Sequence, residues 1–457
     1  MDWEKITARL NEFLAKGKHN ELRGALMMLN SVDIAEYMKS LKGEQLVMVF
    51  RILPKDISAD VFAYMDDDAR KALIESIGDG EIRALISDMF LDDAVDFLEE
   101  MPANVVKRIL QNADPHTREA LNQLLKYPEN SAGSIMTIEY CEFHAGTTAR
   151  QALDEVKRTG IDKETIYTLY VIDRGRHLLG TVALRKLILA ADDAPVETLM
   201  DASACVSVKT LDDQETVADT VRKYDLLSIP VVDNENRLVG IITVDDAIDV
   251  LQEETTEDFE KMAGMAPSDK PYLRTGVFET WKSRVPWLLI LMLSATLTSM
   301  VLTGYETSLA ACSALIAFIP MLTGTGGNSG TQASVAVIRG LSLGEVEFSD
   351  TFRVVWKEIR VAVLCGVTLA ACNFVKLMVV DRFLLHNEGV TVLVAAVICV
   401  TMVFTVLCAK AVGCLLPLLA ERIHLDPAVM ASPFISTVVD VVTLVLYFQV
   451  ARAILHI

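Results

Sequence analysis

Asp440 is the residue whose surroundings point most directly to chemistry. It is the one charged side chain between Pro427 and Val450, an apolar stretch that, as a helix rising ~1.5 Å per residue, can cross a bilayer. A carboxylate at that depth is costly, and such groups usually face a bundle interior or a water-filled path. We therefore expect Asp440 to bind a cation. The alternative is an ion pair with Lys376 or Lys410 on a neighbouring span.

Two further segments are expected to offer oxygen ligands. Pro433 has no N–H to donate to the carbonyl of Val429, and free carbonyls beside a carboxylate suit a hard cation. The segment PMLTGTGGNSGTQ, starting at Pro320, contains four glycines and predicts a poor helix whose irregular backbone lines a cavity. The alternative is that small residues let helices pack closely. The amides Asn328 and Gln332, one turn apart, favour the polar lining.

A stripe of acids precedes the first apolar stretch. The segment TVDDAIDVLQEETTEDFEKM places acids three and four residues apart, which puts them on one face of a helix: Asp246, Asp249, Glu253, Glu257 and Glu260. The ordinary explanation is a solvated face. Because this helix leads into the membrane at Trp281, we expect the stripe to lie over the cytosolic mouth of the path that Asp440 lines.

An internal repeat of about 60 residues precedes that helix. TLYVID followed by GRHLLGTVAL aligns with SIPVVD followed by ENRLVGIITV, and this pattern resembles a tandem CBS pair. CBS pairs often hold an adenosine ribose with a Thr or Ser and an Asp three residues apart. The second copy has Thr243 and Asp246, whereas the first has Ala183 and Lys186. Half of an adenine-nucleotide site, for a ligand such as ATP, is therefore present, unless Asp246 only caps a helix.

The composition divides the chain into two kinds of sequence. Of 457 residues 52% are apolar, yet the formal charge is −20, with most acids before residue 285. An acidic module is a poor match for nucleic acid and a better match for cations. The N-terminus has no signal-peptide pattern, so we expect the first half to stay in the cytosol. The cysteines form no CxxC pair and are expected to pack as small apolar residues.

These features predict a multidomain membrane protein. We expect an all-α superhelical N domain of short stacked helices over residues 1–130, an α/β tandem CBS pair over 133–257, a connecting helix and linker over 258–284, and a five-helix transmembrane domain over 285–457. The expected spans are Val285–Tyr305, Ser308–Ile338, Val361–Val380, Gly389–Ala420 and Pro427–Val450.

Basic residues predict the orientation of these spans. The segment between the second and third spans carries Arg339, Arg353, Lys357 and Arg360, and Lys282 and Arg284 precede the first span. Positive residues favour the cytoplasmic side, so we expect a cytoplasmic N-terminus and an extracytoplasmic C-terminus in the cell membrane.

Over its full length the chain resembles the MgtE family of magnesium channels and transporters. The motifs that carry the resemblance are PMLTGTGGNSGTQ, ASPFISTVVD, DKETIYTLYVID, YDLLSIPVVD and TVDDAIDVLQEETTED, in this family's order. The resemblance implies no enzyme activity but a homodimer of ten spans, with a pore on the two-fold axis lined by the second and fifth spans and an Asp440 from each subunit facing the hydrated ion.

The resemblance also implies which residues touch the metal. In the pore these are Asp440, backbone oxygens of Ser436 and Ser432, and Asn328 nearby. At Ser432 and Thr331 this chain departs from the family, where Asn is common. The cytosolic sensor residues implied by the family are Asp92, Asp96, Glu215, Asp225, Asp246, Asp249, Glu254, Glu257, Asp258 and Asp426.

The expected mechanism is a feedback loop. Plentiful cytosolic Mg²⁺ bridges the acidic faces and closes the pore, and scarce Mg²⁺ lets unscreened carboxylates separate them. No GxxxxGK[ST] motif is present, so flux follows the electrochemical gradient, where a divalent ion gains ~4.6 kcal/mol across ~100 mV. Two alternatives are a transporter for Co²⁺, Ni²⁺ or Ca²⁺, which would favour His or thiolate ligands or a larger oxygen cage, and a membrane-tethered CBS nucleotide sensor without ion flux.

Overall fold

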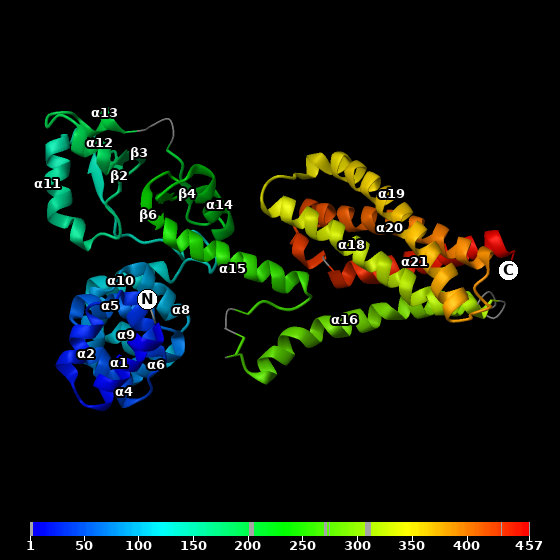
Figure 1. Cartoon of the computed structure of the whole chain (residues 1–457). Coiled ribbons are helices and arrows are strands. Elements are labelled where there is room, and N and C mark those ends of the chain that lie inside the picture. Colours follow the sequence, from blue (N-terminus) through cyan, green and yellow to red (C-terminus); the bar gives the residue numbers. More distant parts are fainter. Residues whose placement is uncertain are drawn as a thin grey trace. The chain divides into compact units, whose positions relative to one another are not determined.

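The computed structural model describes residues 3–200, 205–268, 272–273, 275–306, 312–430 and 432–456, with the backbone alone for Asp56 and Ser432. The chain forms two compact units, Met1–Leu251 and Gln252–Ile457. Figure 1 shows the elements of both.

The first half of unit 1 is a stack of short helices. They are α1 (Trp3–Ala15), α2 (His19–Leu26), α3 (Ser31–Lys39), α4 (Glu44–Ile52), α5 (Lys55–Ala63), α6 (Asp67–Ser76), α7 (Asp79–Asp88), α8 (Leu91–Glu99), α9 (Ala103–Asn112) and α10 (Pro115–Leu124). Helix α3 packs on α5, α5 on α7 and α7 on α9, so alternate helices are neighbours. Each helix is too short to be stable alone, and the stacking supplies the core as predicted.

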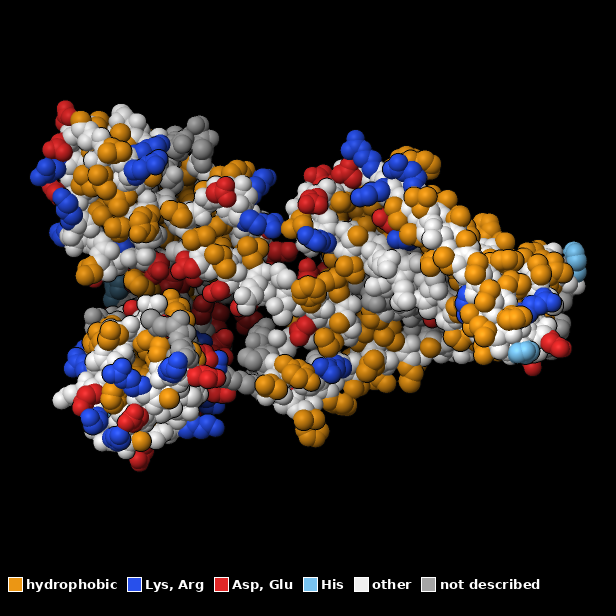
Figure 2. Space-filling model, viewed as in Figure 1, with side chains coloured by type: hydrophobic (Ala, Val, Ile, Leu, Met, Phe, Trp, Pro, Cys, Tyr) orange, Lys and Arg blue, Asp and Glu red, His pale blue; other side chains and the backbone are white. Residues whose placement is uncertain are grey.

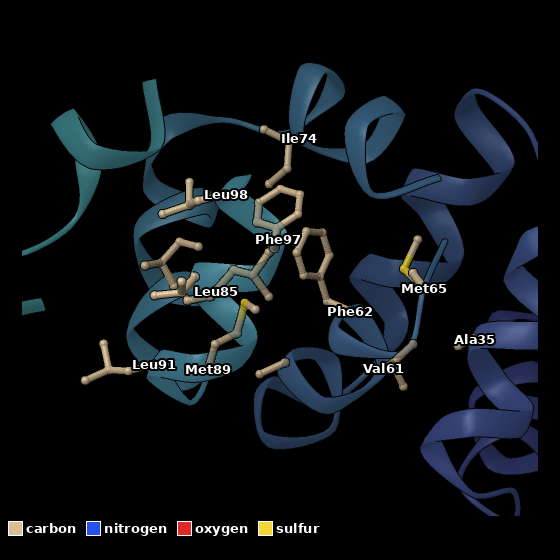
Figure 3. Close-up of a cluster of buried hydrophobic side chains, with 14 of the residues drawn as sticks. Ala35, Val61, Phe62, Met65, Ile74, Leu85, Met89, Leu91, Phe97 and Leu98 are labelled. Carbon is tan, nitrogen blue, oxygen red and sulfur yellow. The ribbon is translucent and has the colours of Figure 1, made fainter. Parts of the chain in front are cut away.

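Aromatic side chains join these helices at the centre of the N domain. The rings of Phe62 and Phe97 meet edge to face with centroids 4.9 Å apart, and both side chains are fully buried (Figure 3). The helix ends use polar residues: Asp66 accepts a hydrogen bond from the amide of Ala69 at 2.9 Å, which caps α6.

The second half of unit 1 contains two small sheets of the same topology. One joins β1 (Glu142–His144), β2 (Thr168–Ile172) and β3 (Leu178–Ala183), and the other β4 (Val208–Lys209), β5 (Ser228–Val232) and β6 (Leu238–Thr243). In each, the first pair is parallel and the second antiparallel, with the same one-residue irregularity. Thr168 pairs with Ala183 as Ser228 pairs with Thr243, which confirms the repeat.

Helices flank both sheets. They are α11 (Ala149–Thr159), α12 (Leu184–Leu189), α13 (Val196–Leu199), α14 (Gln214–Tyr224) and α15 (Val244–Met262), with a 3-10 turn at Gly160–Asp162. The buried core of the N domain continues without interruption through Met136 into the second copy at Val217 and Ile229. The N domain and the second copy therefore form one packed body.

Unit 2 is a bundle of long apolar helices. They are α16 (Val277–Gly304), α18 (Ile319–Ser342), α19 (Thr351–Lys376), α20 (Val392–Arg422) and α21 (Ser432–Leu455). Short 3-10 helices lie at Ser313–Phe318, Phe348–Asp350 and Pro427–Met430, and a π-helix at Leu377–Leu384 extends α19. Among the described residues four helices are long and apolar enough to cross a membrane: α16, α19 with its extensions, α20 and α21 with its preceding turn. Helix α18 is not among them, so the count of five spans stays a prediction.

The expectation for the glycine-rich segment was wrong. It forms a continuous helix, α18, instead of irregular backbone. A side chain at Gly326 would meet Thr405 and Val439 at 2.8 Å, and one at Gly330 would meet Ile435 at 2.7 Å. The glycines therefore let α20 and α21 approach α18 closely, and this contact outweighs their low helix propensity.

Pro433 marks a helix start. It is the second residue of α21, in the first turn, where a backbone N–H has no partner within the helix. The stretch from Pro427 is consequently a 3-10 turn followed by a helix, and it is not one uninterrupted helix.

Candidate metal-binding sites

Asp440 lies in the middle of α21, and the two bases proposed as its partners are engaged elsewhere. The ammonium of Lys376 lies 2.8 Å from Asp381, and that of the buried Lys410 donates to Glu358 at 3.3 Å. Within the described part of the chain no hydrogen bond or ion pair involves Asp440. The ion-pair alternative for Asp440 is therefore wrong, and its carboxylate is half-buried and available to a cation.

Helix α18 lies beside this carboxylate. A side chain at Gly327 would stand 3.3 Å from the hydroxyl of Ser436, one turn before Asp440 on α21. Asn328 and Gln332 are exposed on the face of α18 that the bundle leaves open, whereas Gly326 and Gly330 are buried on the other. Ser432 begins α21, and its side chain lies outside the described atoms. Asn328, Ser436 and Asp440 thus come from two contacting helices.

A second group of carboxylates lies where the N domain meets the CBS pair. Asp92, in the first turn of α8, is 6% exposed. Burial, together with Glu164 and Asp246 nearby, raises its pKa well above the ordinary value. Burial and the charges of Asp93 and Asp246 raise the pKa of Glu164 to about 8, and one of its carboxylate oxygens is buried without a hydrogen-bond partner.

Two further acids complete this group. Burial raises the pKa of Asp93 to about 6 despite Arg70, and the carboxylate of Glu139 accepts a hydrogen bond from the amide of Leu91 at 2.9 Å. Negative groups from four separate stretches of sequence therefore repel one another in a largely buried setting. We call Asp92, Asp93, Glu139, Glu164 and Asp246 the interdomain acidic cluster.

The two residues of the predicted nucleotide half-site, Thr243 and Asp246, are hydrogen-bonded to each other. The carboxylate of Asp246 accepts hydrogen bonds from the hydroxyl of Thr243 and, at 3.3 Å, from its amide. Since α15 begins at Val244, Asp246 stands three residues after the N-cap, the position of a capping acid. Burial raises the pKa of Asp246 to about 6, while the bonds from Thr243 lower it. The helix-cap alternative has direct structural support.

A third group of acids surrounds a lysine in unit 2. The ammonium of Lys261, at the end of α15, lies 2.5 Å from Glu257 and 2.7 Å from Asp426. Burial lowers the pKa of Lys261, but these two carboxylates raise it by more, so the pKa lies above its ordinary value. Asp258 accepts a hydrogen bond from Ser342 at 3.3 Å, and burial followed by Asp426 raises its pKa. This end of α15 is thereby tied to the end of α18 and to the loop before α21.

The remaining predicted sensor residues lie on, or at the end of, α8, α14 and α15. Asp96 follows Asp92 by one turn of α8 but is exposed, Glu215 is exposed in the first turn of α14, and Asp225 is the left-handed residue that ends α14. Asp249 and Glu254 lie on α15, where burial raises the pKa of Asp249. Among the described residues no three His, Cys, Asp or Glu side chains converge closely enough to hold one bare metal ion.

Sequence reasoning missed Glu164 and Glu139. Both lie in connecting segments without helical or strand periodicity, so no pattern placed them against α8. Glu164 falls within the motif DKETIYTLYVID, and this was the single available signal.

An apolar helix bundle with a mid-span carboxylate, joined to an acidic N domain and a CBS pair, defines a membrane transporter for a divalent cation. The family models agree: one described as a divalent cation transporter matches residues 319–450, the MgtE intracellular N domain matches 29–130, and a CBS domain matches 196–253.

The curated relatives extend this match to the whole chain. The magnesium transporter MgtE of Thermus thermophilus is 36% identical over 99% of both chains, and that of Bacillus subtilis is 30% identical over 100% of this chain and 99% of its own. The crystal structure of the cytosolic domain of the Mg²⁺ channel MgtE in complex with ATP, 35% identical, covers 53% of this chain and 99% of its own, with a TM-score of 0.51. The chain belongs to the MgtE family.

Proposed function

We propose that this protein carries Mg²⁺ across the cell membrane into the cytosol down its electrochemical gradient, with Asp440 as the carboxylate that the ion passes. The observation that carries this proposal is that, among the described residues, the carboxylate of Asp440 on α21 has no ion-pair partner, while Lys376 and Lys410 pair with other carboxylates. Mg²⁺ gives up its water reluctantly, so one carboxylate with the oxygens of Ser436 and Ser432 and the amide of Asn328 suits a largely hydrated ion.

A second copy of the chain completes this path in our proposal. On α18 the exposed face carries the amides Asn328 and Gln332, which are costly to leave against lipid. A homodimer that brings two such faces and two Asp440 side chains together gives these groups a polar environment. The mass of the protein in detergent checks this step. A mass of twice 50.3 kDa supports the homodimer, and a mass of 50.3 kDa contradicts it.

In our proposal the cytosolic acids regulate the transport of Mg²⁺. The proposed sensor consists of the interdomain acidic cluster, the acids around Lys261 and the exposed acids named above. In the interdomain cluster the carboxylates repel one another and Glu164 has an unpartnered buried oxygen, so a hydrated divalent cation lowers the energy of the closed arrangement. Around Lys261 the ammonium already serves as a counter-ion, so Mg²⁺ must share or replace it.

ATP is a weaker candidate ligand. A relative 35% identical was crystallised with ATP. In this chain Asp246 is bonded to Thr243, and the first repeat has Ala183 and Lys186 at the matching positions. Binding would require Asp246 to leave its capping role, and calorimetry of the full chain with ATP tests whether it does.

The decisive experiment replaces the carboxylate. We expect Asp440→Asn to lower the rate of Mg²⁺ uptake into liposomes by about tenfold or more, which corresponds to a free-energy barrier to ion passage that is higher by about 1.4 kcal/mol or more. The matched control is Thr437→Val on the same helix, whose hydroxyl donates to the carbonyl of Pro433 at 3.1 Å. Unchanged uptake by Asp440→Asn would refute the proposal, and equal uptake of Co²⁺ or Ni²⁺ by the unmodified protein would refute its selectivity for Mg²⁺.

A further inference from the structure

The first turns of α19 present a basic and aromatic face outward. Phe352 is 82% exposed and Trp356 54% exposed, and Arg353, Lys357 and Arg360 are exposed on the same side of the helix. Their spacing of one, four, five and eight residues after Phe352 keeps all of them on one face. In Figure 2 blue and orange side chains, with some red ones beside them, lie at the upper edge of the helix bundle, over this end of α19.

Two of these cations have no carboxylate partner among the residues that the structure describes. Arg353 pairs with Asp350 at 3.1 Å, but no ion pair involves Lys357 or Arg360 within the described part of the chain. The guanidinium of Arg360 donates to the carbonyl of Trp356, at 3.4 Å. By contrast, Lys261, Lys376 and Lys410 in the same unit all have carboxylates within 3.3 Å.

The same face continues as an apolar surface along the span. Between Arg360 and Val367 the exposed positions are Val363, Leu364 and Val367, at 43%, 71% and 55%. The opposite face carries Ala362, which is fully buried, and Glu358, which pairs with Lys410 of α20. Helix α19 therefore has one side packed on α20 and another that offers cations and aromatic rings above a run of aliphatic side chains.

We propose that this face, Phe352 to Val367, binds an anionic phospholipid. The lipid phosphate would lie between Lys357 and Arg360, the ring of Trp356 at the level of the headgroup, and an acyl chain along Val363, Leu364 and Val367. A lipid fits better than a second protein surface, because a protein covering this face would have to bring its own carboxylates to two unpaired cations as well as an apolar strip. The proposal requires only that α19 crosses the membrane, so it stands independently of which ion is transported.

The test compares lipids on the full-length protein in detergent. Native mass spectrometry is used to titrate phosphatidylglycerol and phosphatidylcholine with identical acyl chains against the unmodified protein and the variant Lys357→Gln/Arg360→Gln. Each lost charge is expected to weaken phosphatidylglycerol binding about 5-fold, which corresponds to about 1 kcal/mol, so the double variant should bind about 25-fold more weakly. Phosphatidylcholine binding should be weak and unchanged. The control variant Lys107→Gln/Lys126→Gln removes two exposed charges from unit 1.

Three results would overturn the proposal. They are equal binding of the two lipids, unchanged phosphatidylglycerol binding by the double variant, and full displacement of the lipid by inorganic phosphate, which would indicate a site for a free anion. A second readout does not depend on those variants. With Trp3, Trp281 and Trp287 replaced by Phe, the fluorescence of Trp356 should be quenched more strongly by brominated phosphatidylglycerol than by brominated phosphatidylcholine, and equal quenching or none would also overturn the proposal.

Discussion

At the scale of single residues, burial decides what the carboxylates do. Asp92 and Glu164 are both carboxylates, and the packing of α8 on the CBS pair removes much of their water. Asp96, one turn away on the same helix, is exposed. A carboxylate thus adds electrostatic repulsion where it is buried beside other acids, and it interacts with water where it is exposed.

Neutralising Glu164 tests that repulsion. We expect Glu164→Gln to raise the midpoint of thermal unfolding of unit 1 in the full chain by about 2–4 °C, or about 1 kcal/mol, in Mg²⁺-free buffer at a pH above 8, where Glu164 is ionised, because one buried negative charge is gone. The same variant should be stabilised less by added Mg²⁺. Glu119→Gln, which removes an exposed charge on α10, is the control and should change neither. A lower midpoint for Glu164→Gln would mean that its charge is already compensated.

At the scale of elements, glycine contacts set how closely the helices of unit 2 approach. A side chain at Gly413 of α20 would stand 2.2 Å from the carbonyl oxygen of Gly330 on α18, so backbone meets backbone there. Close approach of this kind is common where helices associate in membranes. These contacts fix how closely α18 approaches α20 and α21, and they leave Asn328 on the exposed face of α18.

A single methyl group should disturb this packing. We expect Gly413→Ala to destabilise the detergent-solubilised protein by about 1–3 kcal/mol, because neither backbone can move without shifting its helix. Gly304→Ala, at the end of α16, adds a methyl group where no atom lies within 4 Å and should be nearly neutral. Thermal unfolding measures both. Equal midpoints would show that α18 and α20 separate easily.

At the scale of the whole molecule, the acids couple stability to pH and to Mg²⁺. The pKa values of Asp93 and Asp246 are about 6 and that of Glu164 about 8, all above their ordinary values near 4. A raised pKa in the folded state means that stability is greatest when the groups are protonated and falls as pH rises past the unfolded pKa. Without Mg²⁺, the contact between the N domain and the CBS pair should weaken steadily from about pH 4 to pH 8.

Hydrogen exchange in the full chain can follow this change. Peptides covering α8 and β6 should exchange faster at pH 8 than at pH 5 after correction for intrinsic rates, and Mg²⁺ should restore protection mainly at the higher pH, because protons compete with the metal. Peptides from α2, away from the interdomain acidic cluster, serve as the reference. Protection that rises with pH in the absence of Mg²⁺ would contradict the assignment of the interdomain acidic cluster.

The sequence by itself determined the features that depend on local pattern. The period of the apolar residues predicted the short helices of the N domain, the strand repeat and most of the spans, and one charge in an apolar stretch singled out Asp440. These inferences hold because the spacing of apolar residues, and the free-energy cost of burying a charge in an apolar stretch, can both be read from a short segment of the chain.

Only the tertiary structure decided features that depend on which segments meet. It made the glycine-rich segment a helix, since contacts with α20 and α21 offset its weak propensity, and it gave Lys376 and Lys410 partners other than Asp440. It also brought Glu164 and Glu139 to Asp92. Contact between residues far apart in the chain depends on how whole elements pack, and no spacing within one segment encodes that packing.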